Sequence, residues 1–182
     1  MSAKMTPGQT AEIAGPKKAN IFPNAKVASA MIKKATRPLL VIGSDSVNVK
    51  TNDGDMIDSA KRFLKNKKFT GVATGHIVGE FRRRGIDGVK SMSIFVLGKH
   101  LSNPDWEGFD GEGPYDTVLF MGFPYYMEWL VQSGLKNFAT GLRTISLDRT
   151  YHPNAEWSLG WMPEPDWLDA LDTIISSLEE EK

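Results

Sequence analysis

The stretch that most constrains the fold is RPLLVIGS, from Arg37 to Ser44, which contains an unbroken apolar run that ends in glycine and a small polar residue. Strand side chains alternate between two faces, so a strand without polar positions is buried on both, as central parallel strands are. Pro38 can begin such a strand but cannot sit inside it, because it has no N–H for the ladder. Open α/β sheets bind ligands at the carboxyl ends of their strands, so the turn that begins with Gly43 and Ser44 is the first candidate site.

Apolar runs and helical periodicities alternate along the rest of the chain. Further strands are predicted over residues 69–73, 115–121 and 143–147, with weaker ones over 90–94 and 155–159. Helices are predicted over residues 24–35, 56–65, 76–84, 94–101, 124–138 and 165–178. On the 124–138 helix the apolar face is predicted to consist of Tyr126, Met127, Leu130, Val131, Leu135 and Phe138. The alternation predicts an α/β fold of the Rossmann-like kind, a three-layer, doubly wound parallel sheet.

The two ends of the chain differ from this pattern. Residues 1–23 have almost no apolar periodicity and are expected to form a flexible tail, which leaves residues 24–182 as a single domain. Within this tail, Ile21 and Phe22 are the residues expected to make apolar contacts, either with this domain or with another chain. The acidic residues 179–181 are unfavourable at a helix C-terminus and are expected to fray.

Several strand ends should meet at one edge of the predicted sheet, bringing together Gly43, Thr74, Gly75, Gly122 and Asp148. That arrangement resembles a dinucleotide site. No G-x-G-x-x-G motif is present, however, and an acidic side chain directly after Ser44 opposes a pyrophosphate. The glycines are equally explained as small residues that let strands meet helices. Asp148 could hold ribose hydroxyls or cap the following turn.

Composition excludes several kinds of chemistry. The chain has no cysteine, which rules out disulfides, thiolate zinc sites, cysteine nucleophiles and protein-ligated iron–sulfur clusters. The histidines His76, His100 and His152 lie far apart, so no metal site and no catalytic residue is predicted. No apolar run is long enough for a membrane span and no signal-peptide core is present, so a cytoplasmic protein is expected. The basic run 82–84 favours a solvated face or a protein contact over nucleic acid.

Charge is divided unevenly along the chain. Residues 1–100 carry 18 basic and 7 acidic side chains, whereas residues 101–182 carry 4 basic and 15 acidic ones. This asymmetry could survive as a dipole that orients a partner, or it could reflect ordinary solvated faces.

The segment 102–114, SNPDWEGFDGEGP, is a long acidic loop that contains Trp106 and Phe109. Loops of this length inside a domain are often functional. The two aromatic side chains could fold back over the strand ends and close the dinucleotide cleft, or they could anchor a partner.

From about Asn24 to its end, the chain resembles the epsilon subunit of the archaeal carbon monoxide dehydrogenase/acetyl-CoA decarbonylase–synthase complex. The stretches that carry the resemblance are RPLLVIGSDS (37–46), VATGHIVGEF (72–81), LSNPDWEGFDGEGPYDTVLFMG (101–122) and RTISLDRTYHPNAEWSLG (143–160). The resemblance implies a six-stranded parallel sheet, similar to the flavin- or NAD-binding domain of thiamine-diphosphate enzymes and deoxyhypusine synthase. Carried over residue by residue, it implies a dinucleotide edge formed by Gly43, Ser44, Thr74, Gly75, Gly122, Phe123, Asp148 and Arg149.

The resemblance also implies a role. It suggests a non-catalytic accessory subunit bound to the large nickel–iron–sulfur alpha subunit in an alpha2epsilon2 assembly. The accessory subunit would stabilise the large subunit, assist electron transfer to flavin, or do both. No cofactor is required on this hypothesis, although FAD is possible, and the isolated chain could form a homo-oligomer. Neither nucleic acid nor membrane is an expected partner. The alternative is a stand-alone FAD- or NAD-dependent oxidoreductase; a sirtuin-like deacylase is disfavoured because its usual zinc needs thiolates.

Overall fold

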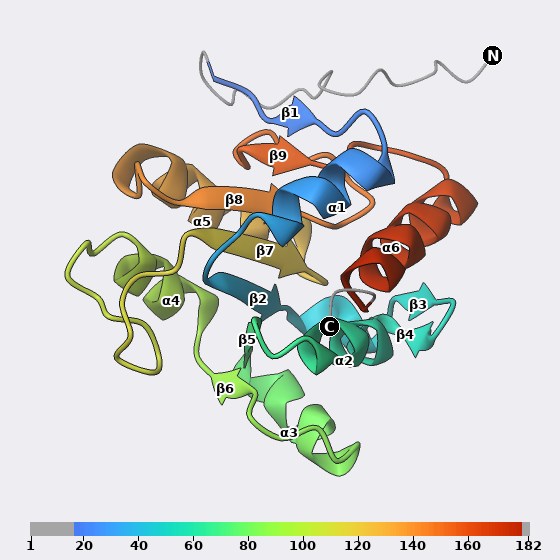
Figure 1. Cartoon of the computed structure of the whole chain (residues 1–182), viewed down its shortest axis with the longest axis horizontal. Coiled ribbons are helices and arrows are strands. Elements are labelled where there is room, and N and C mark those ends of the chain that lie inside the picture. Colours follow the sequence, from blue (N-terminus) through green and yellow to red (C-terminus); the bar gives the residue numbers. More distant parts are fainter. Residues whose placement is uncertain (1–16, 180–182) are drawn as a thin grey trace.

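The computed structural model describes residues 17–179 and contains one large sheet in which every strand pairing is parallel (Figure 1). In spatial order its seven strands are β1 (Asn20–Ile21), β9 (Trp157–Ser158), β8 (Arg143–Ser146), β7 (Thr117–Met121), β2 (Pro38–Ile42), β5 (Thr70–Ala73) and β6 (Lys90–Ser91). The helices are α1 (Ala25–Lys33), α2 (Met56–Lys65), α3 (Gly75–Arg83), α4 (Ile94–Leu101), α5 (Tyr125–Phe138) and α6 (Glu164–Glu179). A 3-10 turn, η1 (Ser44–Val47), and an antiparallel hairpin of β3 (Lys50–Thr51) and β4 (Gly54–Asp55) follow β2. The predicted α/β doubly wound class is confirmed.

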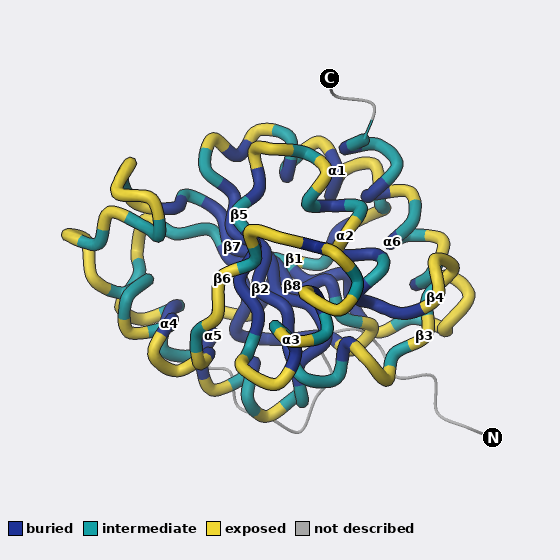
Figure 2. Tube along the Cα trace, turned by 90° about the horizontal axis from the view of Figure 1, so that it is seen from below, coloured by how far each residue is buried: buried dark blue, intermediate teal, exposed yellow. Residues whose placement is uncertain are grey.

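The central strand β2 is covered on both faces, which explains its unbroken apolar sequence. In β2, Leu40 and Ile42 pack into the cluster formed with α1, α2, α3 and α6, whereas Leu39 and Val41 pack into the cluster formed with α4 and α5. Figure 2 shows the buried strands between these helical layers. Because successive strand side chains point to opposite faces, both faces of β2 carry apolar side chains. No helix within residues 17–179 is long and apolar enough to cross a membrane.

The sheet has one strand more than the six that the family resemblance implied. The extra strand, β1, lies in the stretch expected to be a tail, where Asn20 and Ile21 pair with β9. Next to it Phe22 is buried and its ring stacks on Trp157, with ring centroids 4.9 Å apart. Of the two alternatives for this stretch, packing on its own domain is therefore the one observed. The expected fraying is wrong for Glu179, which is the last residue of α6 and forms an ion pair with Arg62. The rest of that prediction, for residues 180 and 181, and the flexible tail expected over residues 1–16 lie outside the described residues.

The predicted apolar face of the 124–138 helix is only partly correct. Val131 and Leu135 are buried, but Tyr126, Leu130 and Phe138 are exposed. The buried face of α5 instead includes Glu128 and Gln132, both with 0% exposure. The contacts of these two side chains are described below.

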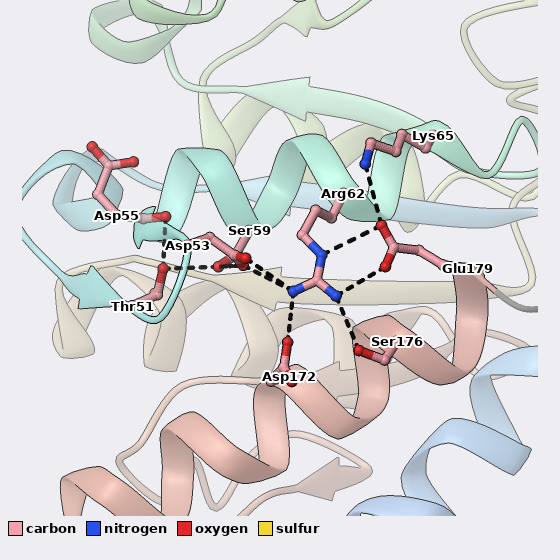
Figure 3. Close-up of polar contacts among 9 residues, drawn as sticks. All are labelled: Thr51, Asp53, Asp55, Ser59, Arg62, Lys65, Asp172, Ser176 and Glu179. Carbon is pink, nitrogen blue, oxygen red and sulfur yellow. Dashed lines mark hydrogen bonds and ion pairs between the residues drawn. The ribbon is translucent and has the colours of Figure 1, made fainter.

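The basic and acidic halves of the chain are joined by ion pairs. Figure 3 shows the Arg62 guanidinium of α2 donating to Asp172 at 2.6 Å and Glu179 at 2.9 Å, both on α6. Arg37, before β2, likewise pairs with Asp110 and with a second carboxylate of the 102–114 loop. Ion pairs within the fold therefore neutralise part of the charge asymmetry between the two halves of the chain.

The loop over residues 102–114 lies at the amino edge of the sheet, so the expectation that it closes the dinucleotide cleft is wrong. Arg37, which donates hydrogen bonds to Asp110 and to the Gly113 carbonyl of the loop, precedes β2, and Tyr115 precedes β7. Trp106 packs on Phe109 at 5.3 Å and on Tyr115 at 5.7 Å between ring centroids. The two aromatic side chains do fold back on their own domain, but at the edge opposite the cleft, because the arginine holds the acidic tip there.

Candidate functional site

The strand order places a topological switch point between β2 and β7. Apart from β1, the order is β9-β8-β7-β2-β5-β6. Starting from β2, the chain adds β5 and β6 on one side of β2 and then β7, β8 and β9 on its other side. In such sheets ligands bind in the crevice at the carboxyl ends of the two central strands. Gly43 follows β2 and Gly122 follows β7, so both predicted glycines stand at this crevice.

The crevice is filled by the chain's own side chains. A methyl group added to Gly43 would overlap the Gly122 carbonyl oxygen and the Phe123 ring. One added to Gly122, which has a φ of 71°, would overlap the Ser46 hydroxyl. These glycines therefore allow close internal packing, the structural reading of the two that the sequence left open.

The backbone amides at the turn are also committed. Gly43 N donates to the Met121 carbonyl at 2.9 Å, and Asp45 N donates to the Gly122 carbonyl at 2.8 Å. The helix that follows is the four-residue turn η1, and Asp45 lies in its first turn. A pyrophosphate needs free N–H groups and no nearby carboxylate, so these residues do not fit a dinucleotide phosphate.

The remaining predicted residues separate into two groups. Gly122, Phe123, Asp148 and Arg149 line a cavity of about 430 Å³ beside the crevice, on the side of β8. Gly43, Ser44, Thr74 and Gly75 do not line it. Thr74 is the N-cap residue of α3, on the far side of β2, and His76 is exposed in the first turn of that helix. The structure thus brings together half of the predicted set.

The cavity has polar walls of both charge signs. Asp45 and Lys50 approach from the turn after β2, whereas Arg149 and Glu164 pair across the other wall at 3.3 Å. Trp167 closes the apolar side and donates from its indole N–H to the Leu147 carbonyl at 2.9 Å.

A buried polar cluster that the sequence analysis missed lies at the floor of this cavity. It consists of Glu128 from the start of α5, Asp148 from the end of β8 and His152 from the loop before β9. His152 Nε2 lies 3.5 Å from Glu128 Oε2. Gln132 Nε2 donates to Glu128 Oε1 at 2.7 Å, and the Gly122 amide donates to Asp148 Oδ1 at 2.7 Å.

Burial perturbs all three groups of the cluster. Loss of hydration, followed by the negative charge of Asp148, raises the pKa of Glu128 well above its ordinary value. Burial also raises the pKa of Asp148, against the opposing hydrogen bond from the Gly122 amide. Burial lowers the pKa of His152 to about 3, so its imidazole is neutral at physiological pH. A neutral imidazole beside one fully buried and one partly buried carboxyl group can exchange a proton or bind a cation.

One signal in the sequence pointed to this cluster. Glu128 and Gln132 recur at the helical spacing of Val131 and Leu135, which places polar side chains on an otherwise inward face. Histidine spacing alone gave no indication, because the two carboxylates come from other elements.

Comparisons with known proteins agree on one family. Residues 1–175 match the family described as CO dehydrogenase beta subunit/acetyl-CoA synthase epsilon subunit. The acetyl-CoA decarbonylase/synthase complex subunit epsilon of Methanothrix soehngenii is 35% identical over 177 residues, covering 95% of this chain and 91% of the relative. The subunit epsilon of Methanothermobacter thermautotrophicus is 31% identical, covering 97% and 98%. Subunit epsilon 1 of Methanosarcina barkeri is 34% identical, covering 84% and 86%. The chain therefore belongs to the family of CO dehydrogenase beta subunits and acetyl-CoA synthase epsilon subunits.

Proposed function

We propose that this chain is the accessory epsilon subunit of an acetyl-CoA decarbonylase/synthase complex and that it stabilises the large nickel–iron–sulfur alpha subunit in an alpha2epsilon2 assembly. The family membership supports a role as a complex subunit. The absence of cysteine supports this role, because thiolate ligands for such clusters would have to come from a partner.

The observation that carries the proposal is an apolar outer face on α4 and α5. Tyr126, Leu130 and Phe138 recur along α5 at multiples of four residues and are 65%, 51% and 75% exposed. Phe95 and Val96 of the adjacent α4 are 51% and 48% exposed. Figure 1 places both helices on one side of the sheet, away from the α1–α6 layer.

A shallow groove of about 210 Å³ runs between these two helices. Gly98 and Gly134 keep it open, and Phe95 and Leu130 form its sides. Monomeric proteins rarely expose several large apolar side chains on one face, and such faces are typical of protein interfaces. We assign the alpha subunit to this face.

The alternative of a stand-alone FAD- or NAD-dependent oxidoreductase has less support. Phe123 and Ser46 fill the switch-point crevice, and the Gly43 and Asp45 amides of the turn are already paired. For the same reason we favour stabilisation of the partner over electron transfer through a flavin bound to this chain. Calorimetric titration with FAD and NAD should give dissociation constants above about 1 μM; tighter binding would support the oxidoreductase instead.

Co-expression with the alpha subunit from the same organism tests the assignment. Tyr126→Ala and Phe138→Ala should each weaken the complex, measured by titration of purified subunits, because exposed aromatic anchors contribute about 2 kcal/mol or more. Trp161→Ala is the matched control, since Trp161 is a 43% exposed aromatic side chain outside this face. Unchanged affinity in both α5 variants, with native circular dichroism, would remove the α4–α5 face from the interface. Failure of the wild-type chain to bind any subunit of the complex would remove the proposal itself.

A further inference from the structure

We propose that the floor of the cavity binds one first-row divalent metal ion, with Glu128, Asp148 and His152 as its protein ligands. This site is separate from the α4–α5 face, and its test does not depend on the partner subunit.

The spacing of the three groups suits a single ion. One ligand atom from each side chain lies within 4.8 Å of the others. The contact between His152 Nε2 and Glu128 Oε2 is 3.5 Å. Two ligands of a tetrahedral zinc ion with bonds of about 2.0–2.2 Å lie roughly 3.4 Å apart, so this pair already has the required separation. Asp148 needs only a small approach to complete a three-residue set.

The surrounding groups hold the ligands from behind. Gln132 donates to one oxygen of Glu128, and the Gly122 amide donates to one oxygen of Asp148, each at 2.7 Å. The Tyr125 ring packs on the His152 imidazole with ring centroids 4.5 Å apart. Neighbouring donors and packing of this kind orient metal ligands in known sites.

Buried polar atoms at the cluster lack hydrogen-bond partners. Among the residues that the structure describes, these include Glu128 Oε2, Gln132 Oε1 and His152 Nδ1. A buried polar atom without a partner is costly, and a bound ion removes that cost for Glu128. The Glu128 oxygen that is free is the one that faces His152.

Charge also favours a cation. Within residues 17–179 no lysine or arginine forms an ion pair with Glu128 or Asp148. One divalent ion neutralises two carboxylates and leaves the imidazole uncharged. A mixed nitrogen and oxygen set suits zinc, manganese, iron or cobalt better than magnesium or calcium. Asp148 and His152 line the cavity, which gives the ion a route from solvent.

Zinc and cobalt are the probes for this site. The purified chain is dialysed against a chelator and titrated calorimetrically with Zn²⁺, and bound metal is counted by mass spectrometry. We expect one ion per chain with a dissociation constant below about 10 μM. In the Co²⁺ form, visible absorption should report a nitrogen- and oxygen-ligated ion of low coordination number.

Substitutions locate the ion. Glu128→Gln keeps the shape of the side chain, and His152→Gln removes the nitrogen ligand; each should weaken binding by at least about tenfold. The variant with both His76→Gln and His100→Gln is the matched control, because it removes the other two histidines of the chain, and it should bind as the wild type does.

Imidazole NMR signals keep the test decisive if a cluster variant does not fold. Addition of Zn²⁺ to the wild type should shift the His152 resonances and leave those of His76 and His100 in place. The proposal is overturned if the wild-type chain binds neither Zn²⁺ nor Co²⁺, if both cluster variants bind normally, or if zinc shifts only the surface histidines.

Discussion

Replacement of Arg62 by methionine should lower the free energy of unfolding by about 2–3 kcal/mol. Methionine keeps the apolar stem of the side chain but removes the guanidinium that joins α2 to α6 (Figure 3). The lost contacts include hydrogen bonds to Asp172 at 2.6 Å, to Ser176 at 3.0 Å and to both carboxylate oxygens of Glu179 at 2.9 and 3.3 Å. Asp53, which lies before α2, also loses its partner at 3.0 Å.

The magnitude follows from the exposure of these groups. Removal of one partner of a fully buried pair costs about 3–5 kcal/mol, whereas an exposed pair contributes about 0–1 kcal/mol. The Arg62 side chain is 19% exposed, but Asp53, Glu179 and Asp172 are 23%, 29% and 46% exposed and can be rehydrated. The network therefore lies between the two limits, and the individual hydrogen bonds cannot simply be added because they share one guanidinium.

Urea denaturation of the full chain measures this change, and thermal melting should show a decrease of about 5–10 °C for a protein of this size. Arg82→Met is the control, because Arg82 is exposed on α3 and forms no ion pair with any residue in 17–179; it should change stability by less than about 0.5 kcal/mol. A loss of 0.5 kcal/mol or less for Arg62→Met, at low ionic strength, would refute the reasoning and would mean that α6 is held by its apolar contacts alone.

Three further predictions concern other parts of the fold. Gly43→Ala should destabilise the chain by about 1–3 kcal/mol in urea denaturation, because its methyl group meets backbone, whereas Gly79→Ala, in open space on a helix, should be neutral or stabilising by up to about 1 kcal/mol. Burial would raise the pKa of Asp55, but the hydrogen bond from Arg84 and two amide hydrogen bonds outweigh it and hold that pKa below 3.8. The ion pair therefore stabilises the fold at pH values above 3.8, and this stabilisation is lost as the pH falls through the pKa of Asp55 in the folded protein. Stability measured from pH 7 to pH 3 should fall less steeply in Arg84→Met than in the wild type. Trp106→Ala should lower the melting temperature of the isolated chain, with a cost of about 2–3 kcal/mol, and a loss of alpha-subunit binding without a change in melting would contradict this.

The central sheet was predictable because its strands are buried on both faces. The run from Pro38 to Ile42 has no polar position, and the structure makes it the strand between β5 and β7. Helices such as α2 and α4 were found from periodicity, since one face of each packs on the sheet. The strand β1 was not found, because a strand of two residues is too short to show a periodicity. It is stabilised by pairing with β9, whose residues lie 137 positions later in the chain.

The candidate site was only half predictable, for a physical reason. The strand order correctly locates the carboxyl edge, but the order does not specify what fills it. Phe123 was assigned to a cofactor edge, yet its ring occupies the space above Gly43. Side-chain packing between residues 80 positions apart leaves no local pattern in the sequence, and the same holds for the contact between Glu128 and His152.

The helix α5 connects the two proposals, because each of its faces carries side chains that depart from the ordinary amphipathic pattern. A helix that only covers a sheet buries apolar side chains and exposes polar ones. Here Glu128 and Gln132 point inward to the cavity floor, whereas Tyr126 and Phe138 point outward. Both exceptions act against the stability of an isolated monomer, since buried carboxyl groups and exposed aromatic rings are each unfavourable without partners. A cation at the inner face and a subunit at the outer face would supply the two partners that the fold of this chain does not provide by itself.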